Sequence, residues 1–343
     1  MQIKPASNED KERWDAFVRN HPEGSPFHLF AWHDAVVKSF GHRSYYYLAV
    51  ENDIIIGILP LFQLKSFLFG NIISSVPFAA YGGILADSDE TFQLLLEKPQ
   101  NLTQECNADY LELKFFNSKV CGLHEPGLHY TFIKEISSDH DENMKAIPRK
   151  QRAMVRKGMK SGLSAHVGVG DQYLDDFYRV FARNVHQLGT PVYPKKWFQF
   201  LLYEFGPDAE IMVIKHEDTT ISGVLSLYYK DMILPYYAGS LIEYRDYAPN
   251  DFQYWELMRR AVERGCSYFD FGRSKKDSGH FSFKKHWGFE PQALHYQFYL
   301  HKLSKLPEVN PRNPKYRRKI EAWKRLPHGI TKMLGPQIVK YIP

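Results

Sequence analysis

Cysteine is scarce in this sequence, which contains only Cys106, Cys121 and Cys266 and no Cys-x-x-Cys pair. An odd number of widely spaced cysteines argues against a disulfide framework and offers no ligand set for a structural zinc ion. Unpaired thiols are typical of reducing compartments. We therefore expect a cytoplasmic protein without a structural metal.

A long hydrophobic run is also missing. The most apolar stretch, residues 54–62, is interrupted by Gly57 and Pro60. A membrane-spanning helix needs about 20 consecutive apolar residues, so this stretch is too short to cross a bilayer. The first residues, MQIKPASNEDKERW, show no apolar segment after a basic start, and we expect no secretory signal.

The motifs of several enzyme classes are missing too. The sequence contains no Walker loop, no Gly-x-Ser-x-Gly nucleophile elbow and no group of His and Glu at metal-ligand spacing. These absences argue against a P-loop nucleotidase, a serine hydrolase of the elbow type and a metallohydrolase.

What the sequence does contain is a repeated pattern. Its 343 residues suffice for two domains. Residues 45–62 and 211–229 each predict a β-hairpin around a polar turn, and the segments ENDIIIGILPL and EDTTISGVLSL within them align residue by residue. Each hairpin is followed by a tyrosine and small residues, Tyr81-Gly82-Gly83 in one half and Tyr237-Ala238-Gly239 in the other. We therefore predict a duplicated mixed α/β unit.

The two halves meet in a basic segment, IPRKQRAMVRKGMKSGL, at residues 147–163. We predict a first domain over residues 1–145, a second over 146–305 and a basic amphipathic tail over 306–343. In the second domain, Asn250 or Asp251 is expected to cap a helix that runs to Arg264.

The basic segment holds cations without an intervening acid. In a helix, Arg149, Arg152, Arg156 and Lys160 would share one face at spacings of three or four. Like charges so placed destabilise a helix by roughly 0.2–0.5 kcal/mol per pair, so the arrangement needs a reason. One interpretation is a docking surface for phosphates of RNA or of a nucleotide-linked substrate. The other is a solvated helix whose acidic partners come from elsewhere in the fold.

Asp270 lies in the aromatic strand YFDFG, residues 268–272. A carboxylate there is costly to bury unless it is paired. It could act as a catalytic base that deprotonates or orients an incoming ammonium group. The alternative, which we favour, is a structural ion pair with Arg273 or Arg245.

Two further segments suit a ligand. Residues 236–240, YYAGS, end a strand with small residues, so backbone N–H groups near Tyr237 could polarise an acyl carbonyl; aromatic core packing is the alternative. Lys284 and Lys285 lie among aromatic residues in FKKHWGF and could meet phosphates, or could be exposed lysines beside a turn. We expect substitutions of Arg152, Arg156, Lys284 or Lys285 to weaken donor binding with little effect on folding.

The tail beyond residue 310 is strongly basic. Tyr316, Ile320 and Trp323 predict a short apolar stripe beside its cations. That combination suits an anionic membrane surface, and a tail packed on its own domain is the alternative. A single acid, Glu321, accompanies nine cations: Arg312, Lys315, Arg317, Arg318, Lys319, Lys324, Arg325, Lys332 and Lys340.

The block YYAGSLIEYRDYAPNDFQYWELMRRAVERGCSYFDFGRS, followed by FSFKKHWGF, resembles the FemA/FemB-type (FemAB) peptidoglycan aminoacyltransferases. The likeness rests on the YYAG strand end, Trp255-Glu256 in the helix, the strand before Gly272, and Phe283-Lys284-Lys285. The segments SFGHRSYYYLAV, RKQRAMVRKG and DFGRSK are most similar to FemAB-like proteins encoded alongside exosortase and PEP-CTERM sorting systems.

The resemblance implies two tandem GNAT-like domains, with the acceptor substrate on the first and an activated aminoacyl donor, typically aminoacyl-tRNA, on the second. It implies no metal or prosthetic group. Lys38, in FHLFAWHDAVVK, matches a lysine that contacts substrate phosphate in the family, and we assign Tyr81 to the same substrate.

Where relatives carry an arginine for the nucleotide-sugar phosphate, this chain has Tyr193-Pro194 followed by Lys195 and Lys196. We assign these two lysines and Arg273 to substrate binding. That departure from the family's pattern leaves the phosphate contact itself in question.

The function implied is amide formation on an amine of a cell-envelope precursor, either peptidoglycan or exopolysaccharide, by a cytoplasmic protein that can lie at the inner face of the membrane. Neither half carries the Gln/Arg-x-x-Gly-x-Gly/Ala loop with which CoA-dependent GNAT enzymes hold pyrophosphate. This absence counts against a CoA-dependent N-acyltransferase acting on an amino sugar. A non-catalytic protein that binds RNA or the envelope through its basic helix is the remaining alternative.

Overall fold

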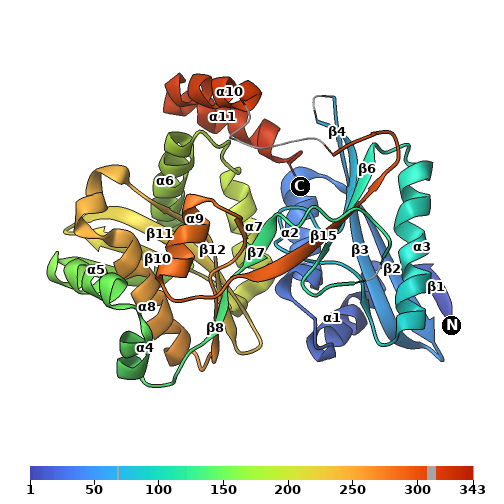
Figure 1. Cartoon of the computed structure of the whole chain (residues 1–343), viewed down its shortest axis with the longest axis horizontal. Helices are drawn as coiled ribbons and strands as arrows, with labels where there is room; N and C mark the ends of the chain where they lie inside the picture. Colours follow the sequence, from blue (N-terminus) through green and yellow to red (C-terminus); the bar gives the residue numbers. More distant parts are fainter. Residues whose placement is uncertain (68, 120, 307–313, 343) are drawn as a thin grey trace. The chain divides into compact units, whose positions relative to one another are not determined.

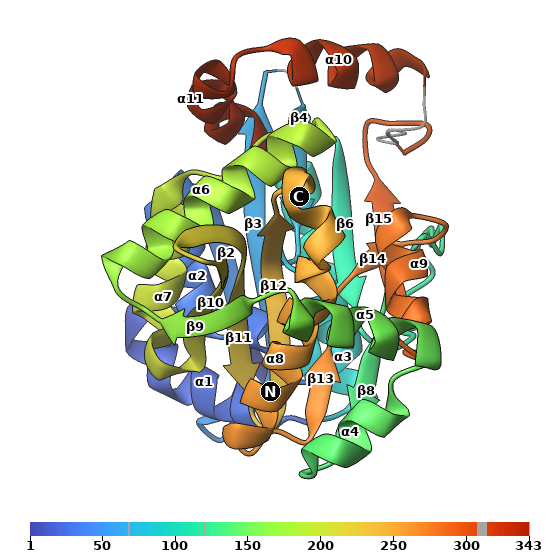
Figure 2. The same ribbon diagram turned by 90° about the vertical axis from the view of Figure 1, so that its left-hand side faces the viewer.

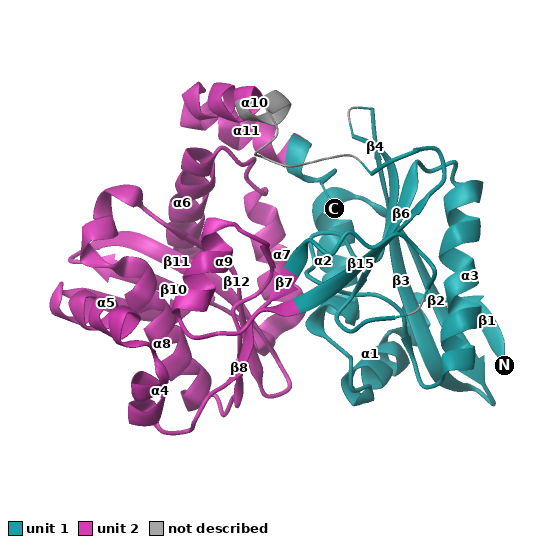
Figure 3. Ribbon diagram, viewed as in Figure 1, with its two compact units in different colours: residues 1–129, 293–308, 338–343 teal, residues 130–292, 309–337 magenta. Residues whose placement is uncertain are grey.

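The structure is a computed structural model that describes residues 1–67, 69–119, 121–306 and 314–342 (Figure 1). It divides into two compact units (Figure 3). Unit 1 comprises residues 1–129, 293–308 and 338–343, and unit 2 comprises residues 130–292 and 309–337.

This division departs from the predicted boundaries at residues 145 and 305. Residues 130–145 belong to unit 2 because β8 (Ile133–Glu135) pairs antiparallel with β13 (Tyr268–Asp270). Residues 293–305 belong to unit 1 because β15 (Gln292–Leu300) pairs antiparallel with β6 (Tyr110–Phe115). Each unit thus gains a strand from the sequence assigned to the other half.

Unit 1 is a mixed α/β unit around one sheet. Its strand order is β1-β2-β3-β4-β6-β15, with β5 against β3, and β4 runs parallel to β6. Its elements are β1 (Gln2–Pro5), α1 (Lys11–Asn20), α2 (Phe30–Phe40), β2 (Arg43–Glu51), β3 (Ile54–Ser66), β4 (Gly70–Ser74), β5 (Leu85–Ala86), α3 (Asp89–Glu105), β6 and β15, with 3₁₀ turns η1 (Asn8–Asp10) and η2 (Pro26–His28). The strand β7 (His129–Thr131) spans the division between the units.

Unit 2 repeats the arrangement. Its strand order is β9-β10-β11-β12-β13-β8, and β12 runs parallel to β13. Its elements are β8, α4 (His140–Ala146), α5 (Arg149–Lys160), β9 (Leu163–Gly168), α6 (Asp171–Leu188), α7 (Lys195–Phe205), β10 (Ala209–His216), β11 (Thr219–Tyr229), β12 (Met232–Ser240), α8 (Pro249–Glu263), β13, β14 (Ser274–Lys275), α9 (Gly279–His286), α10 (Pro314–Arg325) and α11 (His328–Val339), with 3₁₀ turns η3 (Gly206–Asp208) and η4 (Ile242–Tyr247).

The predicted duplication is confirmed. Both units run strand, two helices, three antiparallel strands, helix and parallel strand, as β1-α1-α2-β2-β3-β4-α3-β6 and as β9-α6-α7-β10-β11-β12-α8-β13. Residues 45–62 and 211–229 form the equivalent hairpins β2–β3 and β10–β11. In the first hairpin Asn52 and Asp53 adopt positive φ values of 49° and 64°, as a tight two-residue turn requires.

Equivalent glycines allow a helix to approach each sheet. A Cβ added at Gly57 would lie 2.7 Å from Thr91 of α3, and one added at Gly223 would lie 3.3 Å from Phe177 of α6. The neighbouring Ser222 instead donates a hydrogen bond to Gln253 of α8. Because successive strand residues point to opposite faces, α6 and α8 cover opposite faces of the unit 2 sheet.

Helix α8 begins at Pro249, with Ala248 as its N-cap, and not at the predicted cap Asn250 or Asp251. Proline suits the first helical position because its missing N–H has no partner there. Asp251 is instead buried and accepts hydrogen bonds from Gln151 of α5 and from the Trp287 indole. The carboxylate therefore ties α5 and the end of α9 to α8.

Helices α5 and α8 cross closely (Figure 2). Gly158 makes the crossing fit, because a Cβ there would lie 2.7 Å from the Cβ of Phe252. Among the residues that the structure describes, no helix is both long and apolar enough to span a bilayer.

Candidate active site

The candidate site lies in unit 2, where β12 and β13 separate. Their parallel pairing covers only Met232 and Ile233 of β12, while β12 continues to Ser240. On its other edge the register with β11 shifts by one residue between Leu225 and Ser226, so Tyr236 is the extra residue of a β-bulge. Bulges of this kind re-aim side chains and occur next to active sites.

A turn after β13 carries the next candidates. Asp270 is buried, and its carboxylate accepts hydrogen bonds from Thr131 Oγ1 at 2.8 Å and from the backbone N–H of Gly272 at 2.7 Å. Gly272 has a φ of 74°, which glycine adopts without strain. These contacts give Asp270 a positioning role for the turn, and its role as a base stays a prediction.

Lys284 closes the same turn from α9. Its ammonium donates to the carbonyl oxygens of Gly272 at 2.6 Å and Arg273 at 3.1 Å. Burial lowers the pKa of Lys284 to about 7, although the nearby Asp270 charge acts in the opposite direction.

Only 6% of Lys284 is accessible, so the interpretation of this residue as an exposed lysine beside a turn is wrong. Its burial also argues against the prediction that its loss has little effect on folding. Its neighbour Lys285 is exposed, as predicted for a lysine beside a turn. Helical geometry turns these consecutive residues in different directions.

Tyr237 lies in an aromatic cluster beside this turn. Its ring centroid is 5.2 Å from Phe198 and 5.4 Å from Tyr193. Burial raises the pKa of Tyr237 well above its usual value of 10, so the phenol stays protonated near neutral pH and can donate a proton in a hydrogen bond but cannot serve as a phenolate base.

Arg273 is exposed and lies near the same cluster. Burial raises the pKa of Tyr193 to about 12, and the positive charge of Arg273 partly opposes that rise. The same charge acts on Tyr237. The turn held by Asp270 and Lys284 thus places a guanidinium beside the two phenols.

Helix α7 starts directly after Tyr193. Lys195 is half-buried and forms an ion pair with Asp175, whereas Lys196 is exposed. The structure therefore leaves Lys196 more accessible to an anionic ligand than Lys195.

The predicted basic helix is α5. Arg149, Lys150, Arg156, Lys157 and Lys160 are all exposed on it. Among the described residues, none of these five forms an ion pair with an acid, so the fold supplies no counter-charge there. Arg152 is half-buried, and its Nε has no hydrogen-bond partner within the described part of the chain.

Two predicted substrate residues lie in unit 1. Lys38 is exposed in the last turn of α2. Tyr81 is buried, with its ring edge-to-face with Phe27 at 5.2 Å and Phe116 at 5.1 Å. Tyr81 is therefore covered by aromatic rings, as a core residue would be.

Sequence analysis missed a strained segment just before Tyr81. Val76 and Phe78 both have a φ of 64°, which is costly for a β-branched or bulky side chain. Buried side chains hold the nearby carbonyls: Lys114 Nζ donates to Val76 O at 3.3 Å, and Trp32 Nε1 donates to Pro77 O at 3.2 Å. The sequence gives no signal for this strain, because it depends on partners distant along the chain.

The acetyltransferase (GNAT) domain family matches residues 149–285, which contain α5, the β12–β13 separation and Lys284. FemX, a solved structure, superposes with a TM-score of 0.65 at 18% identity and covers 88% of this chain and 98% of its own. The chain thus has the fold of two GNAT domains in tandem.

A second solved structure gives the same fold. A tandem GNAT protein from the clavulanic acid biosynthesis pathway superposes on this chain with a TM-score of 0.59 at 10% identity, covering 89% of this chain and 99% of its own. The predicted fold class, two tandem GNAT-like α/β domains, is confirmed.

A curated relative of the chain is the "Lipid II:glycine glycyltransferase" of Staphylococcus epidermidis, 34% identical over 79 residues. The alignment covers 21% of this chain and 19% of that protein. The match thus spans about a fifth of the relative's length.

Proposed function

We propose that the protein is an aminoacyltransferase that forms an amide on an amine of a cell-envelope precursor, with aminoacyl-tRNA as the donor. The observation that carries the proposal is the row of exposed cations on α5, which have no acidic partners within the described residues. The same domain holds the turn that Asp270 and Lys284 stabilise. A polyanionic donor would supply the missing counter-charge.

The chemistry asked of the protein is modest. The acceptor nitrogen would attack the ester carbonyl of the donor, and the C–O bond to the ribose would break. The proton lost by the nitrogen would pass to the leaving ribose oxygen, which departs as a hydroxyl group. Because an ester is converted into a more stable amide, the site mainly needs to position the reactants and stabilise the oxyanion of the tetrahedral intermediate. Backbone N–H groups near the bulge at Tyr236 and Tyr237 would serve that purpose.

Arg273 would bind a phosphate near the reacting ester. Its position is fixed by the turn in which Asp270 and Lys284 hold the backbone of residues 272 and 273. Lys285 and Lys196 would add charge, and Lys38 would bind the acceptor's phosphate in unit 1.

The acceptor is proposed from the similarity to a lipid II glycyltransferase. An exopolysaccharide amine, suggested by the likeness to exosortase-associated proteins, is the other acceptor to test. The protein would act in the cytoplasm, at the inner face of the membrane when its acceptor is lipid-linked.

A donor screen tests the proposal. Aminoacyl-tRNA pools and acyl-CoAs would be offered separately with lipid II-type and exopolysaccharide precursors, and transfer would be detected by mass spectrometry. We expect transfer from aminoacyl-tRNA, and Arg273→Ala should reduce it at least tenfold. Arg179→Ala, which removes an exposed arginine paired with Asp176 on α6, is the matched control.

Transfer from acyl-CoA alone would replace the proposal by a CoA-dependent N-acyltransferase. RNA binding without any transfer would favour a non-catalytic binding protein.

A further inference from the structure

The two C-terminal helices differ in which side they turn toward the rest of unit 2. Ile320 of α10 packs against Gly189, where an added Cβ would lie 2.4 Å from its side chain. Trp323 is half-buried. Ile320 and Trp323, the two described residues of the predicted apolar stripe, therefore face their own domain, as the second of the two interpretations predicted. Arg312 lies outside the described residues, as do the side chains of Lys315, Tyr316 and Arg317.

A different apolar stripe is exposed on α11. Ile330, Met333 and Leu334 retain 41%, 68% and 39% of their accessible surface. Their spacing of i, i+3 and i+4 puts them on one face of the helix. The opposite face is buried through Thr331 and Gly335, with Gly335 against the backbone of Val192.

This orientation is unusual for a surface helix. The polar face of such a helix normally meets water and its apolar face meets the core. In α11 Ile330, Met333 and Leu334 point outward, although the buried face has a residue as small as Gly335. Contiguous exposed apolar side chains of this kind mark surfaces that meet another apolar phase.

Cations surround the stripe in sequence. Arg318, Lys319, Lys324, Arg325 and Lys332 are exposed on α10 and α11. The one acid, Glu321, lies 3.6 Å from Lys324. Beyond residue 310 the sequence has nine Lys and Arg against one acid, whereas the first 310 residues have 35 against 38. The basic character of the chain is thus concentrated in these helices.

We propose that α10 and α11 dock the protein on an anionic phospholipid surface. The Ile330–Met333–Leu334 stripe enters the boundary between headgroups and acyl chains, and the cations meet lipid phosphates. Each Lys or Arg near such a surface adds to the attraction for the anionic lipids. An RNA partner would use the cations but would leave the apolar stripe in water, so the stripe favours a lipid.

This inference does not require the proposed transfer reaction. Vesicle binding is measured without donor or acceptor, so failure of docking and failure of catalysis are separate results. A protein that binds vesicles but transfers nothing would keep the inference and overturn the proposed function.

The test is flotation of the full chain with vesicles of phosphatidylglycerol and phosphatidylcholine, compared with phosphatidylcholine alone. We expect binding to the anionic vesicles only. Replacing all three stripe residues by serine should lower the partition coefficient at least tenfold, as should the double variant Arg318→Glu/Arg325→Glu.

Val169→Ser and Leu188→Ser are matched controls, since these residues are 60% and 53% exposed elsewhere in unit 2. If the triple variant lowers the melting temperature, vesicle binding by the single variant Met333→Ser is the test, because Met333 is the most exposed of the three residues.

Three results would overturn the inference. The first is unchanged vesicle binding by the stripe variants, and the second is an equal loss of vesicle binding in the two control variants. The third is self-association of the chain that rises with concentration and is abolished by the stripe variants, while the vesicles bind no protein. Full competition by soluble RNA, with no effect of the stripe variants, would instead identify a general polyanion site.

Discussion

At the scale of single residues, a buried lysine decides how the candidate site is held together. Lys284 of α9 donates hydrogen bonds to the carbonyl oxygens of both Gly272 and Arg273. The lysine therefore supports the turn that presents Arg273, whatever else it does in the reaction.

Replacing this lysine should destabilise the fold. Lys284→Met removes both hydrogen bonds, and hydrogen bonds that involve a charged group contribute about 1.5–3 kcal/mol, so we expect a loss of about 2 kcal/mol in the free energy of unfolding. Lys285→Met is the matched control and should change it by less than about 0.5 kcal/mol. Urea denaturation at pH 7 measures both. Equal effects of the two substitutions would contradict the buried position.

The same lysine should couple stability to pH. Its pKa in the folded protein is about 7, below its usual value of 10.5, because burial disfavours the charged form. Between these values the unfolded chain binds more protons, so stability rises with pH. Below pH 7 the cost of burying the charge is present in full. The wild type should therefore gain melting temperature relative to Lys284→Met between pH 7 and pH 9. A constant difference would argue against the depressed pKa.

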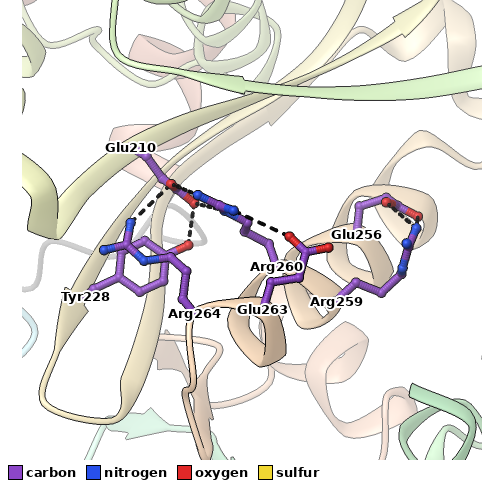
Figure 4. Close-up of polar contacts among 7 residues, drawn as sticks. All are labelled: Glu210, Tyr228, Glu256, Arg259, Arg260, Glu263 and Arg264. Carbon is purple, nitrogen blue, oxygen red and sulfur yellow. Dashed lines mark hydrogen bonds and ion pairs between the residues drawn. The ribbon is translucent and has the colours of Figure 1, made fainter. Parts of the chain in front are cut away.

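Glu210 is a second buried charge, and Figure 4 shows it between three donors. It accepts hydrogen bonds from Tyr228, from Arg260 at 3.0 and 3.1 Å and from Arg264 at 3.2 Å. Arg264 also lies over the Tyr228 ring, 3.8 Å from its centroid. Burial acts to raise the pKa of Glu210, but the hydrogen bonds from Arg260 and Tyr228 and the two arginine charges outweigh it and lower the pKa below its usual value of 4.5.

Removing that charge should be costly. Breaking a buried ion pair by removing one partner costs about 3–5 kcal/mol. Because the side chains of Arg260 and Arg264 keep 32% and 25% exposure, we expect Glu210→Gln to cost about 3 kcal/mol, at the lower end of that range.

Glu263→Gln removes an exposed partner of Arg260 and should cost less than about 1 kcal/mol. The stability that Glu210 contributes is present above pH 4.5 and is lost as the pH falls through its lowered pKa. The difference between wild type and Glu210→Gln in urea denaturation should therefore shrink as the pH is lowered below 4.5. A difference that stays constant down to pH 3 would exclude the charged network.

At the scale of secondary-structure elements, local sequence signals were sufficient to predict the two hairpins. Alternating apolar residues around a polar turn are a short-range pattern, so residues 45–62 and 211–229 could be assigned before any pairing was known. The duplication followed from their alignment.

Long-range pairings could not be predicted in this way. Strand β8 has three residues, Ile133–Glu135, and its partner β13 lies more than 130 positions further along the sequence. Nothing local in residues 130–145 indicates to which sheet they belong. The burial of Lys284 and the outward face of α11 escaped prediction for the same reason, because tertiary packing decides which side of a helix is covered.

The crossing of α5 and α8 gives a test at this scale. Gly158→Ala should destabilise the protein by about 1–3 kcal/mol, because the new Cβ meets Phe252 in a packed interface. In an isolated helix alanine is more stable than glycine by about 1 kcal/mol. A loss of stability on Gly158→Ala therefore means that the steric conflict at the crossing outweighs this helix preference. Gly329→Ala in α11 has no atom within 4 Å of the added Cβ and should be neutral or stabilising. Thermal denaturation of the two variants checks the prediction, and stabilisation by Gly158→Ala would mean that the helices do not cross closely.

At the scale of the whole molecule, the distribution of charge matters more than its sum. The net charge of +5 combines a strongly basic C-terminus with a slightly acidic remainder. Within that remainder, α5 concentrates cations that have no acidic partner among the described residues. The chain thus has two separate basic surfaces, one with an exposed apolar stripe and one without, and we assign them to lipid and to the aminoacyl-tRNA donor respectively.

The salt dependence of donor binding distinguishes these surfaces. Each phosphate contact with single-stranded nucleic acid adds about 0.7 to the slope of log affinity against log salt concentration, because bound counterions are released. Arg156→Ala/Lys160→Ala should therefore weaken tRNA binding at low salt and reduce that slope by about 1.4, since two contacts at about 0.7 each are removed. The melting temperature should change little, because both side chains are exposed.

The matched control is Arg179→Ala/Arg183→Ala on α6, where the two exposed arginines already pair with Asp176 and Glu243. Fluorescence anisotropy with labelled tRNA between 50 and 200 mM salt measures the wild type and both variants, together with Arg318→Glu/Arg325→Glu on α10. An unchanged slope in the α5 variant, with a reduced slope in the α10 variant, would reverse the assignment. The donor would then bind the C-terminal helices, since counterion release reports which cations the phosphates meet.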